Sequence, residues 1–568
     1  MKLPKSKLYR FLYKHWWEFA FGFFFAFGIA FCFFGFLDKG ENESSSTYNA
    51  IKVFLLHHSF KENTPISCMM EVGRWFLVIA FVLLSFKLFL TIIAPKFIGL
   101  LKIKIKKNHI VICGLNKFTM GLINKCPDKK IVVITSGNSN QYVESLKQRR
   151  IKLIIGNPTD QKILKLANIA KAKRLYAITS DDNKNVDIAY NACELSKKSR
   201  KLAYPLEALA LINDSDLKQI LEESALFKYN CLDDKGKAYF DGMVFNFHES
   251  GTKHGIKEQL KLILPLDNTT QHTILIIGID PNSENVILCL AHCITMNGKT
   301  LKFVIVDKSE KAIEKFKHDY YFLQEFAEFE FIHKDIELLS QNELCSITNI
   351  IPLSSIFVCW GSYEENIKIS LMLRFAMKNE KPDIFVFCNY PETISIVLND
   401  PANENLLLRK DNIHTINTFD EAFDYILELE EKLEQIAKLA HEKWNEANEN
   451  KMDYEKLTEH FKQSNRNQIS DYYFKVHIAI GKSLEECLEQ NYRLNFTPEQ
   501  REMLSNMEHR RWMIEKYLDW WTHGKAREDR FRKHPDLVPW DQLLESAKRK
   551  DRDAIDLMMQ VMNGERGS

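Results

Sequence analysis

The chain of 568 residues lacks a large net charge, a C-x-x-C cysteine pair and a zinc motif. Lys and Arg number 77 against 75 Asp and Glu, so the formal net charge is only +2. Nucleic-acid binders normally carry a strongly basic face, so we predict no nucleic-acid partner. The 12 cysteines are scattered singly, which indicates reduced thiols in a cytosolic body.

Motifs of common catalytic sites are also missing. The sequence has no hydride-transfer constellation, no Walker lysine loop and no nucleophile elbow. Its Cys, His and Asp residues do not fall at the spacing of a triad or a metal site. We therefore expect no enzymatic activity, no catalytic residues, no bound metal and no certain cofactor. At this length, the usual domain size predicts three or four domains.

Two long apolar runs stand near the beginning of the chain. Residues 19–37 are uncharged and apolar, and such a helix spans roughly 28 Å, close to the hydrocarbon thickness of a bilayer. The run 75–94 is interrupted only by Lys87. Lysine-rich flanks precede the first run and follow the second, which places both termini and the large C-terminal region in the cytoplasm. We predict a multi-pass transmembrane hairpin over 1–107, with the lipid bilayer as a partner.

Details of the hairpin leave alternatives open. Lys87 either lines an aqueous pore or snorkels to the interface. Residues 46–60 have helical spacing and predict a short helix in the external loop, but nothing between 38 and 72 resembles the carbonyl filter of potassium channels. A small-residue stripe either admits another helix or arises by chance in an apolar span; its members are Gly22, Ala26 and Ala30.

An α/β pattern follows the hairpin. Residues 108–125 read as an apolar strand, a glycine turn and a helix start, and further strands and helices alternate behind them. With Gly114 at the turn, 156–160 after the third strand and 179–186 after the fourth, this region resembles the Trk/RCK-type (TrkA-N-like) regulatory domains of potassium channels and transporters. We predict a first Rossmann-like domain over 108–265.

The turn departs from the dinucleotide-binding pattern. The G-x-G-x-x-G positions hold Gly114, Asn116 and Thr119, and a side chain at the second position hinders a pyrophosphate. Thr135 stands where a ribose-binding acid is expected. Gly114 and Asn116 are therefore weak nucleotide-binding candidates, and we favour a role for this turn in the fold alone.

A second Rossmann-like domain is predicted over 266–417, because strand and helix alternate again from residue 272. Its turn, with Gly278, Asp280 and Ser283, is also degraded. Asp307 ends the second strand and is a further weak nucleotide-binding candidate. It lies 29 residues after Gly278 rather than about 20, so an exposed structural carboxylate is the favoured interpretation.

The pattern becomes helical from residue 418, and strand signals vanish. We predict a helical linker domain over 418–495 and a last domain over 496–568. Residues 507–554 resemble the ryanodine-receptor-type (RyR) repeat, a small helical module. The matching positions are Glu508, Trp512, Trp521, Gly524, Arg527, Asp529, 534–540 and 551–553.

The two resemblances together imply one architecture. The chain is similar to bacterial membrane proteins with two spans, tandem TrkA-N-like domains and a C-terminal RyR-type domain. The implied fold class is α/β with membrane and all-α parts, and the implied location is the bacterial inner (cell) membrane.

The last domain concentrates groups that suit a nucleotide-derived ligand. Arginine forks bind phosphate, and indole faces stack on purines. The predicted ligand-binding residues are His509, Trp512, Trp521, Arg527, Arg530, Lys533, His534 and Trp540, with Asn465 and Arg466 on a facing wall. The alternative is that the apolar members, including Trp512 and Trp540, simply pack a small core.

We therefore expect a ligand-gated membrane effector or channel-like protein, controlled by a small nucleotide-like ligand at the RyR-type domain. Two spans cannot enclose a pore alone, so a homo-oligomer is implied and a tetramer is favoured. The resemblance adds an antiphage defence role. One alternative is a regulator of potassium or cation transport that senses NAD(H) or adenine nucleotide through the RCK-type domains. Another is a non-conducting scaffold.

Overall fold

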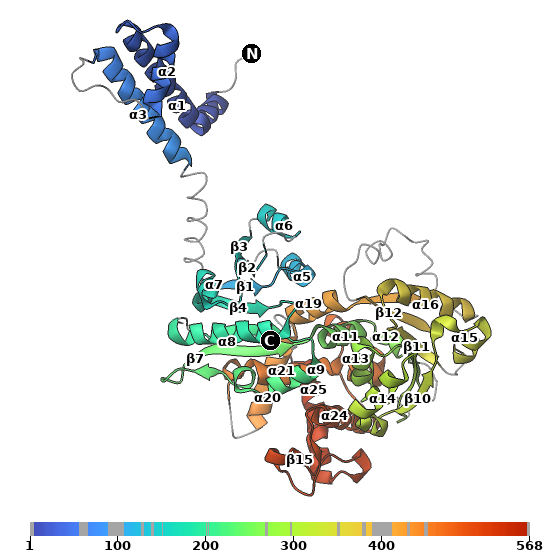
Figure 1. Ribbon diagram of the computed structural model, residues 1–568. Helices are drawn as coiled ribbons and strands as arrows, with labels where there is room; N and C mark the ends of the chain where they lie inside the picture. Colours follow the sequence, from blue (N-terminus) through green and yellow to red (C-terminus); the bar gives the residue numbers. More distant parts are fainter. Residues whose placement is uncertain are drawn as a thin grey trace. The chain divides into compact units, whose positions relative to one another are not determined.

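The computed structural model describes residues 5–55, 66–88, 107–126, 130–137, 141–149, 151–199, 202, 204–266, 271–295, 298–348, 353–377, 382–388, 412–428, 432–447 and 452–564. The chain divides into two compact units, Met1–Ile105 and Lys106–Ser568. Among the described residues, the first holds the helices drawn in blue in Figure 1, α1 to α3, and the second holds the later helices, two large sheets and a two-stranded one.

The first unit consists of α1 (Lys5–Leu37), α2 (Glu43–Phe54) and α3 (Cys68–Leu88). The segments Glu18–Leu37 and Cys68–Leu88 are long and apolar enough to cross a membrane. The second apolar helix begins at Cys68, earlier than the predicted start at residue 75, because 68–74 continue its helical pattern. The predicted end of that run at 89–94 lies outside the described residues.

Glycines set the distance between α1 and α3. A Cβ added to Gly28 would lie 2.7 Å from Leu77, and one added to Gly73 would lie 2.7 Å from the sulfur of Cys32. Small residues let helix backbones approach in this way. For Gly22, from the predicted stripe, an added Cβ meets no described atom within 4 Å, so Gly22 does not set this distance.

The second unit begins with a seven-stranded sheet of order β3-β2-β1-β4-β5-β7-β6, parallel except for the β6–β7 pair. Its core strands are apolar at nearly every position because helices cover both faces. The strands are β1 (His109–Cys113), β2 (Ile131–Thr135), β3 (Lys152–Ile155), β4 (Ala172–Ala177), β5 (Leu206–Leu211), β6 (Cys231–Leu232) and β7 (Ala238–Phe245). The helices are α5 (Lys117–Lys125), α6 (Val143–Gln148), α7 (Gln161–Leu166), α8 (Asp182–Ser199), α9 (Ser215–Glu222), α10 (Ala225–Lys228), α11 (Phe247–Glu258) and α12 (Leu260–Ile263).

A second sheet of six parallel strands follows, in the order β10-β9-β8-β11-β12-β13. Both sheets place the first strand of each domain in the middle, which is the Rossmann-like order. The strands are β8 (Thr273–Ile277), β9 (Lys302–Asp307), β10 (Glu328–His333), β11 (Leu353–Val358), β12 (Asp383–Cys388) and β13 (Ile413–Asn417). The helices are α13 (Pro281–Leu290), α14 (Glu310–Asp319), η3 (Tyr321–Glu325), α15 (Gln341–Thr348) and α16 (Tyr363–Ala376).

The two α/β halves exchange helices. Helix α11 leaves the first sheet and packs so closely on the start of α19 (Thr418–Glu428), which follows the second sheet, that a Cβ on Gly251 would meet the carbonyl of Thr418 at 1.8 Å. Helix α19 in turn packs on α5, where Phe423 faces Gly121. Figure 1 shows α11 and α19 together between the sheets. Each half therefore packs one of its helices against the other half.

The remaining helices share a core with the second sheet. One apolar cluster runs from Ile256 through Phe303 and Phe474 to Met562. The helices are α20 (Lys432–Ala447), α21 (Glu459–Ser470), α22 (Tyr472–Ile480), α23 (Leu484–Glu489), α24 (Pro498–Leu518) and α25 (Glu545–Gly564). The expectation that strands vanish after residue 418 is wrong, since β14 (Thr522–His523) pairs with β15 (Lys533–His534).

Candidate ligand site

The predicted rings of the last domain gather around α24. Thr497 caps this helix and Pro498 occupies its first turn, as the sequence predicts. His509 and Trp512 are three residues apart, which places them on one face of the helix, and their rings stack with centroids 5.7 Å apart. His534 meets Trp512 edge-on at 4.9 Å. Together with Trp521 and Trp540, they form what we call the aromatic cluster: His509, Trp512, Trp521, His534 and Trp540.

Hydrogen bonds fix the two imidazoles of the cluster. His509 is 2% exposed, and its Nε2 lies 2.9 Å from the carbonyl oxygen of Val538. In His534, Nδ1 accepts a hydrogen bond from the backbone N–H of Asp536. Burial lowers the pKa of His534, although Asp536 opposes the shift, so this ring is neutral at neutral pH. Both imidazoles are therefore held by backbone contacts.

A cavity of about 230 Å³ lies beside the cluster, between the RyR-type region and η3 of the second α/β half. Its lining includes His509, Trp540 and Phe326. Arg510 also lines it, and its guanidinium donates hydrogen bonds to the carbonyls of Ala291, His292 and Phe326. Those bonds anchor the RyR-type region on the second half, so an occupant of the cavity would contact both.

Cations surround the outer indoles. Lys548 and Arg552 lie 5.4 and 6.0 Å from the ring centre of Trp540. Arg527 lies 6.0 Å from the ring of Trp521 and pairs with Asp529 at 2.8 Å. The side chain of Arg527 is 63% exposed. Arg530 and Lys533 are also exposed. The structure thus joins the predicted rings and leaves the predicted cations at the surface.

Asn465 and Arg466 occupy a different place. The side-chain amide of Asn465 donates to the carbonyl of Phe461, and Arg466 is buried in an ion pair of 2.6 Å with Glu434. Neither residue is among those that line the cavity within the described part of the chain. Their predicted role as a facing wall stays a prediction.

A buried ion network beside the cluster escaped the sequence reasoning. Lys475 is 1% exposed on α22 and pairs with Asp471 and, at 2.5 Å, with Glu508 of α24. Arg511 bonds Glu508 at 2.7 Å, and His292 of the second half pairs with Asp471 at 2.7 Å. Burial alone would raise the pKa values of Asp471 and Glu508. The neighbouring cations outweigh burial, so the pKa of each carboxyl is lowered, that of Glu508 to about 2. Helical spacing shows the pairs Asp471–Lys475 and Glu508–Arg511, but not the pairs Lys475–Glu508 and His292–Asp471, which join different elements.

At the first Rossmann-like turn, the chain's own side chains occupy the helix start. Gly114 has a φ of +110°, and an added Cβ would lie 2.6 Å from the carbonyl oxygen of Ile178, so this turn requires glycine. The Asn116 side chain caps α5 by accepting from the N–H of Thr119 and donates to Ile178. This geometry favours a role in the fold; nucleotide binding at Gly114 and Asn116 stays a prediction.

Asp307 in the second half is 7% exposed, so the expected exposure of this carboxylate is wrong. It accepts hydrogen bonds of 2.7 Å from the backbone N–H groups of Ile279 and Ser309. These bonds tie the turn after β8 to the end of β9, which explains its burial. At the same turn, Asp280 and Ser283 form a capping box on α13. Ribose binding by Asp307 is not tested by this geometry.

In the first unit, Lys87 forms an ion pair of 3.1 Å with Glu18. The pair neutralises Lys87, which with Arg74 is one of the two cations of α3, and the predicted pore role of Lys87 stays a prediction. Among the residues that the structure describes, no group of three or more His, Cys, Asp or Glu side chains is placed to hold a metal ion.

The fold and site thus define a two-sheet Rossmann-like protein with a helical C-terminal module and two candidate membrane helices. The TrkA-N domain family matches residues 110–227, and the RyR domain family matches residues 495–564. The predicted combination of a TrkA-N-like domain with a C-terminal RyR-type domain is confirmed.

An uncharacterized protein of Methanocaldococcus jannaschii is 29% identical over 123 residues, which are 21% of this chain and 25% of that protein. The chain therefore spans about a quarter of this relative. Among solved structures, GsuK bound to ADP is 17% identical, with a TM-score of 0.39 over 73% of this chain and 96% of that one. The human SLO3 gating ring is 11% identical, with a TM-score of 0.38 over 58% and 85%.

Proposed function

We propose that this protein is a ligand-gated membrane effector, in which a nucleotide-derived signal binds the RyR-type domain and controls an oligomeric two-span membrane domain. The observation that carries the proposal is the aromatic cluster beside a 230 Å³ cavity shared with the second α/β half. A purine ring stacks on indole or imidazole faces, and exposed arginines bind phosphate. A ligand that prefers one arrangement of the two domains shifts the population toward it.

The first unit supplies the output of this proposal. Large apolar side chains are exposed along both candidate spans, including Phe23, Phe27, Trp75 and Val82, as expected of surfaces that lipid or neighbouring spans cover. Two spans do not enclose a pore, so we infer a homo-oligomer, with a tetramer favoured, in the inner membrane of a bacterium. Ligand-triggered depolarisation would suit antiphage defence.

A second candidate function rests on the TrkA-N match over residues 110–227. In it, the α/β halves sense NAD(H) or adenine nucleotide and regulate cation transport. The turns at Asn116 and Asp280 weigh against it, because these side chains already cap the helices that would receive a pyrophosphate. The scaffold alternative predicts no ligand at either place.

Calorimetry on the full-length protein with a panel of adenine and cyclic nucleotides tests the receptor. The account predicts at least tenfold weaker binding of the active nucleotide in both Trp540→Leu and Arg527→Ala. The matched control is Lys456→Ala, whose lysine sits in an exposed ion pair with Asp453. Binding that neither substitution weakens would place the receptor outside the RyR-type domain.

A further inference from the structure

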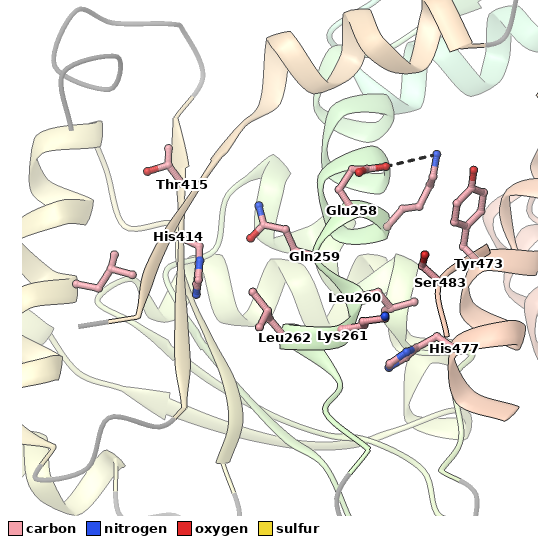
Figure 2. A pocket seen from close by; sticks show the side chains of 12 residues that line it. Glu258, Gln259, Leu260, Lys261, Leu262, His414, Thr415, Tyr473, His477 and Ser483 are labelled. Atoms are coloured by element: carbon pink, nitrogen blue, oxygen red, sulfur yellow. Dashed lines mark ion pairs between the residues drawn. The ribbon is translucent and has the colours of Figure 1, made fainter. Parts of the chain in front are cut away.

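The second unit contains a larger cavity away from the aromatic cluster. It measures about 620 Å³ and lies where α11–α12, β13 and α22 meet (Figure 2). Pockets that enclose small organic ligands usually measure about 300–1,000 Å³. Its walls come from the segment that links the two sheets, from the last strand of the second sheet and from the helical module. No predicted site residue lines it.

Two cations border this cavity. The side chain of Lys257 is 2% exposed; its ammonium lies 4.0 Å from the ring centre of Tyr473 and 3.8 Å from the carboxylate of Glu258. That carboxylate is 47% exposed, so solvent screens it. Lys261 stands at the rim in an ion pair with Glu486. With Lys257 and Lys261 against Glu258, the charged groups of the lining leave it net positive, which suits an anionic occupant.

Two buried acceptors also line the cavity. Nε2 of His477 lies 2.7 Å from the carbonyl oxygen of Leu264 and therefore carries the ring proton. Burial lowers the pKa of His477, so the ring is neutral and Nδ1 presents a lone pair. Neither Nδ1 of His477 nor Oε1 of Gln259 has a hydrogen-bond partner among the described residues. Buried acceptors normally receive a donor.

We propose that this cavity is a second ligand site, which binds an organic anion of mononucleotide size that also carries N–H or O–H donors. The anionic group meets Lys257 and Lys261, and a donor meets Nδ1 of His477. Leu262 and Tyr473 cover the less polar part of the ligand. Bound there, the ligand contacts both α/β halves and the helical module. This site does not depend on the aromatic cluster.

Hydrogen exchange on the full-length protein in lipid nanodiscs tests the site, with AMP, ribose 5-phosphate and inorganic phosphate as probes. We expect AMP to slow exchange at 257–262 and 413–415. Leu262→Trp fills the cavity from a residue that is 40% exposed, so the fold is retained, and Lys261→Glu reverses the rim charge. Each substitution should raise the AMP concentration that gives half of the full protection at least tenfold. Leu338→Trp, at a residue 82% exposed and outside the cavity, should leave that AMP concentration unchanged.

The proposal is overturned if no probe slows hydrogen exchange in these segments. It is also overturned if AMP slows exchange in Leu262→Trp and Lys261→Glu as strongly as in the unsubstituted protein. If inorganic phosphate slowed exchange as strongly as AMP, the proposed mononucleotide size of the ligand would be wrong. Trp540→Leu separates this site from the proposed receptor, because protection at 257–262 persists in that variant if the second site is independent.

Discussion

At the residue scale, one enclosed lysine connects the RyR-type domain to the helices before it. Lys475 is 1% exposed and pairs with Asp471 and Glu508. Breaking a buried pair leaves an uncompensated charge, so Lys475→Ala should lower the free energy of unfolding by about 3–5 kcal/mol. Lys456→Ala removes an exposed pair and should cost under about 1 kcal/mol. Chemical denaturation measures both, and equal losses would contradict the enclosed network.

The same network predicts acid sensitivity. The pKa of Glu508 falls from 4.5 to about 2, because Arg511 and Lys475 outweigh burial. A carboxyl whose pKa is lower in the folded state stabilises the fold above its unfolded pKa. Unfolding free energy should therefore drop between pH 4.5 and about 2, by up to about 3 kcal/mol from this group. Glu508→Gln should flatten that slope, and an unchanged slope would rule Glu508 out as its source.

Residue types indicated the rings that meet around α24, and ligand binding by them stays a prediction. His509, Trp512 and His534 meet because helix spacing and one short ladder bring them together. The resemblance marked Glu508 without giving it a role, and its partner Lys475 lies on another helix. Arg466 was expected at a ligand but is buried against Glu434. Such partners depend on tertiary packing, which spacing along one chain does not encode.

At the scale of elements, the exchanged helices α11 and α19 depend on Gly251. A Cβ there would lie 1.8 Å from the carbonyl oxygen of Thr418, and an overpacked contact costs about 1–3 kcal/mol. Gly251→Ala should lower the thermal midpoint by several degrees. Gly137→Ala is the control, because an added Cβ there meets no atom of the described residues within 4 Å. Equal midpoints in a calorimetric scan would mean that the close contact does not hold the halves together.

Alternation of strand and helix predicted most elements of both sheets. It missed β5, β6 and β7 in the first half, β13 in the second half, and the short β14–β15 ladder. β7 contains Asp241 and Gly242, which interrupt an apolar strand pattern, and in β13 the adjacent His414 and Thr415 separate two isoleucines. Two-residue strands leave no periodicity to detect.

At the scale of the whole molecule, we propose that ligand binding at the RyR-type domain controls the two-span membrane domain. The RyR-type domain shares a core with the second α/β half, and that half exchanges helices with the first. A ligand at the cavity of Trp540 and Phe326 therefore acts on a continuous body. The two domain types are assigned from the family matches. The packing between them is what would transmit the effect of a ligand from one domain to the other.

The central claim is tested most directly by ion flux from liposomes that contain the full-length protein, with adenine and cyclic nucleotides added outside. The account predicts flux that requires one nucleotide, disappears in Arg527→Ala and Trp540→Leu, and persists in Gly137→Trp, at a position where an added Cβ meets no described atom within 4 Å. Flux that survives both substitutions in the RyR-type domain but is lost in Gly137→Trp, or a protein that conducts under none of these conditions, would contradict it.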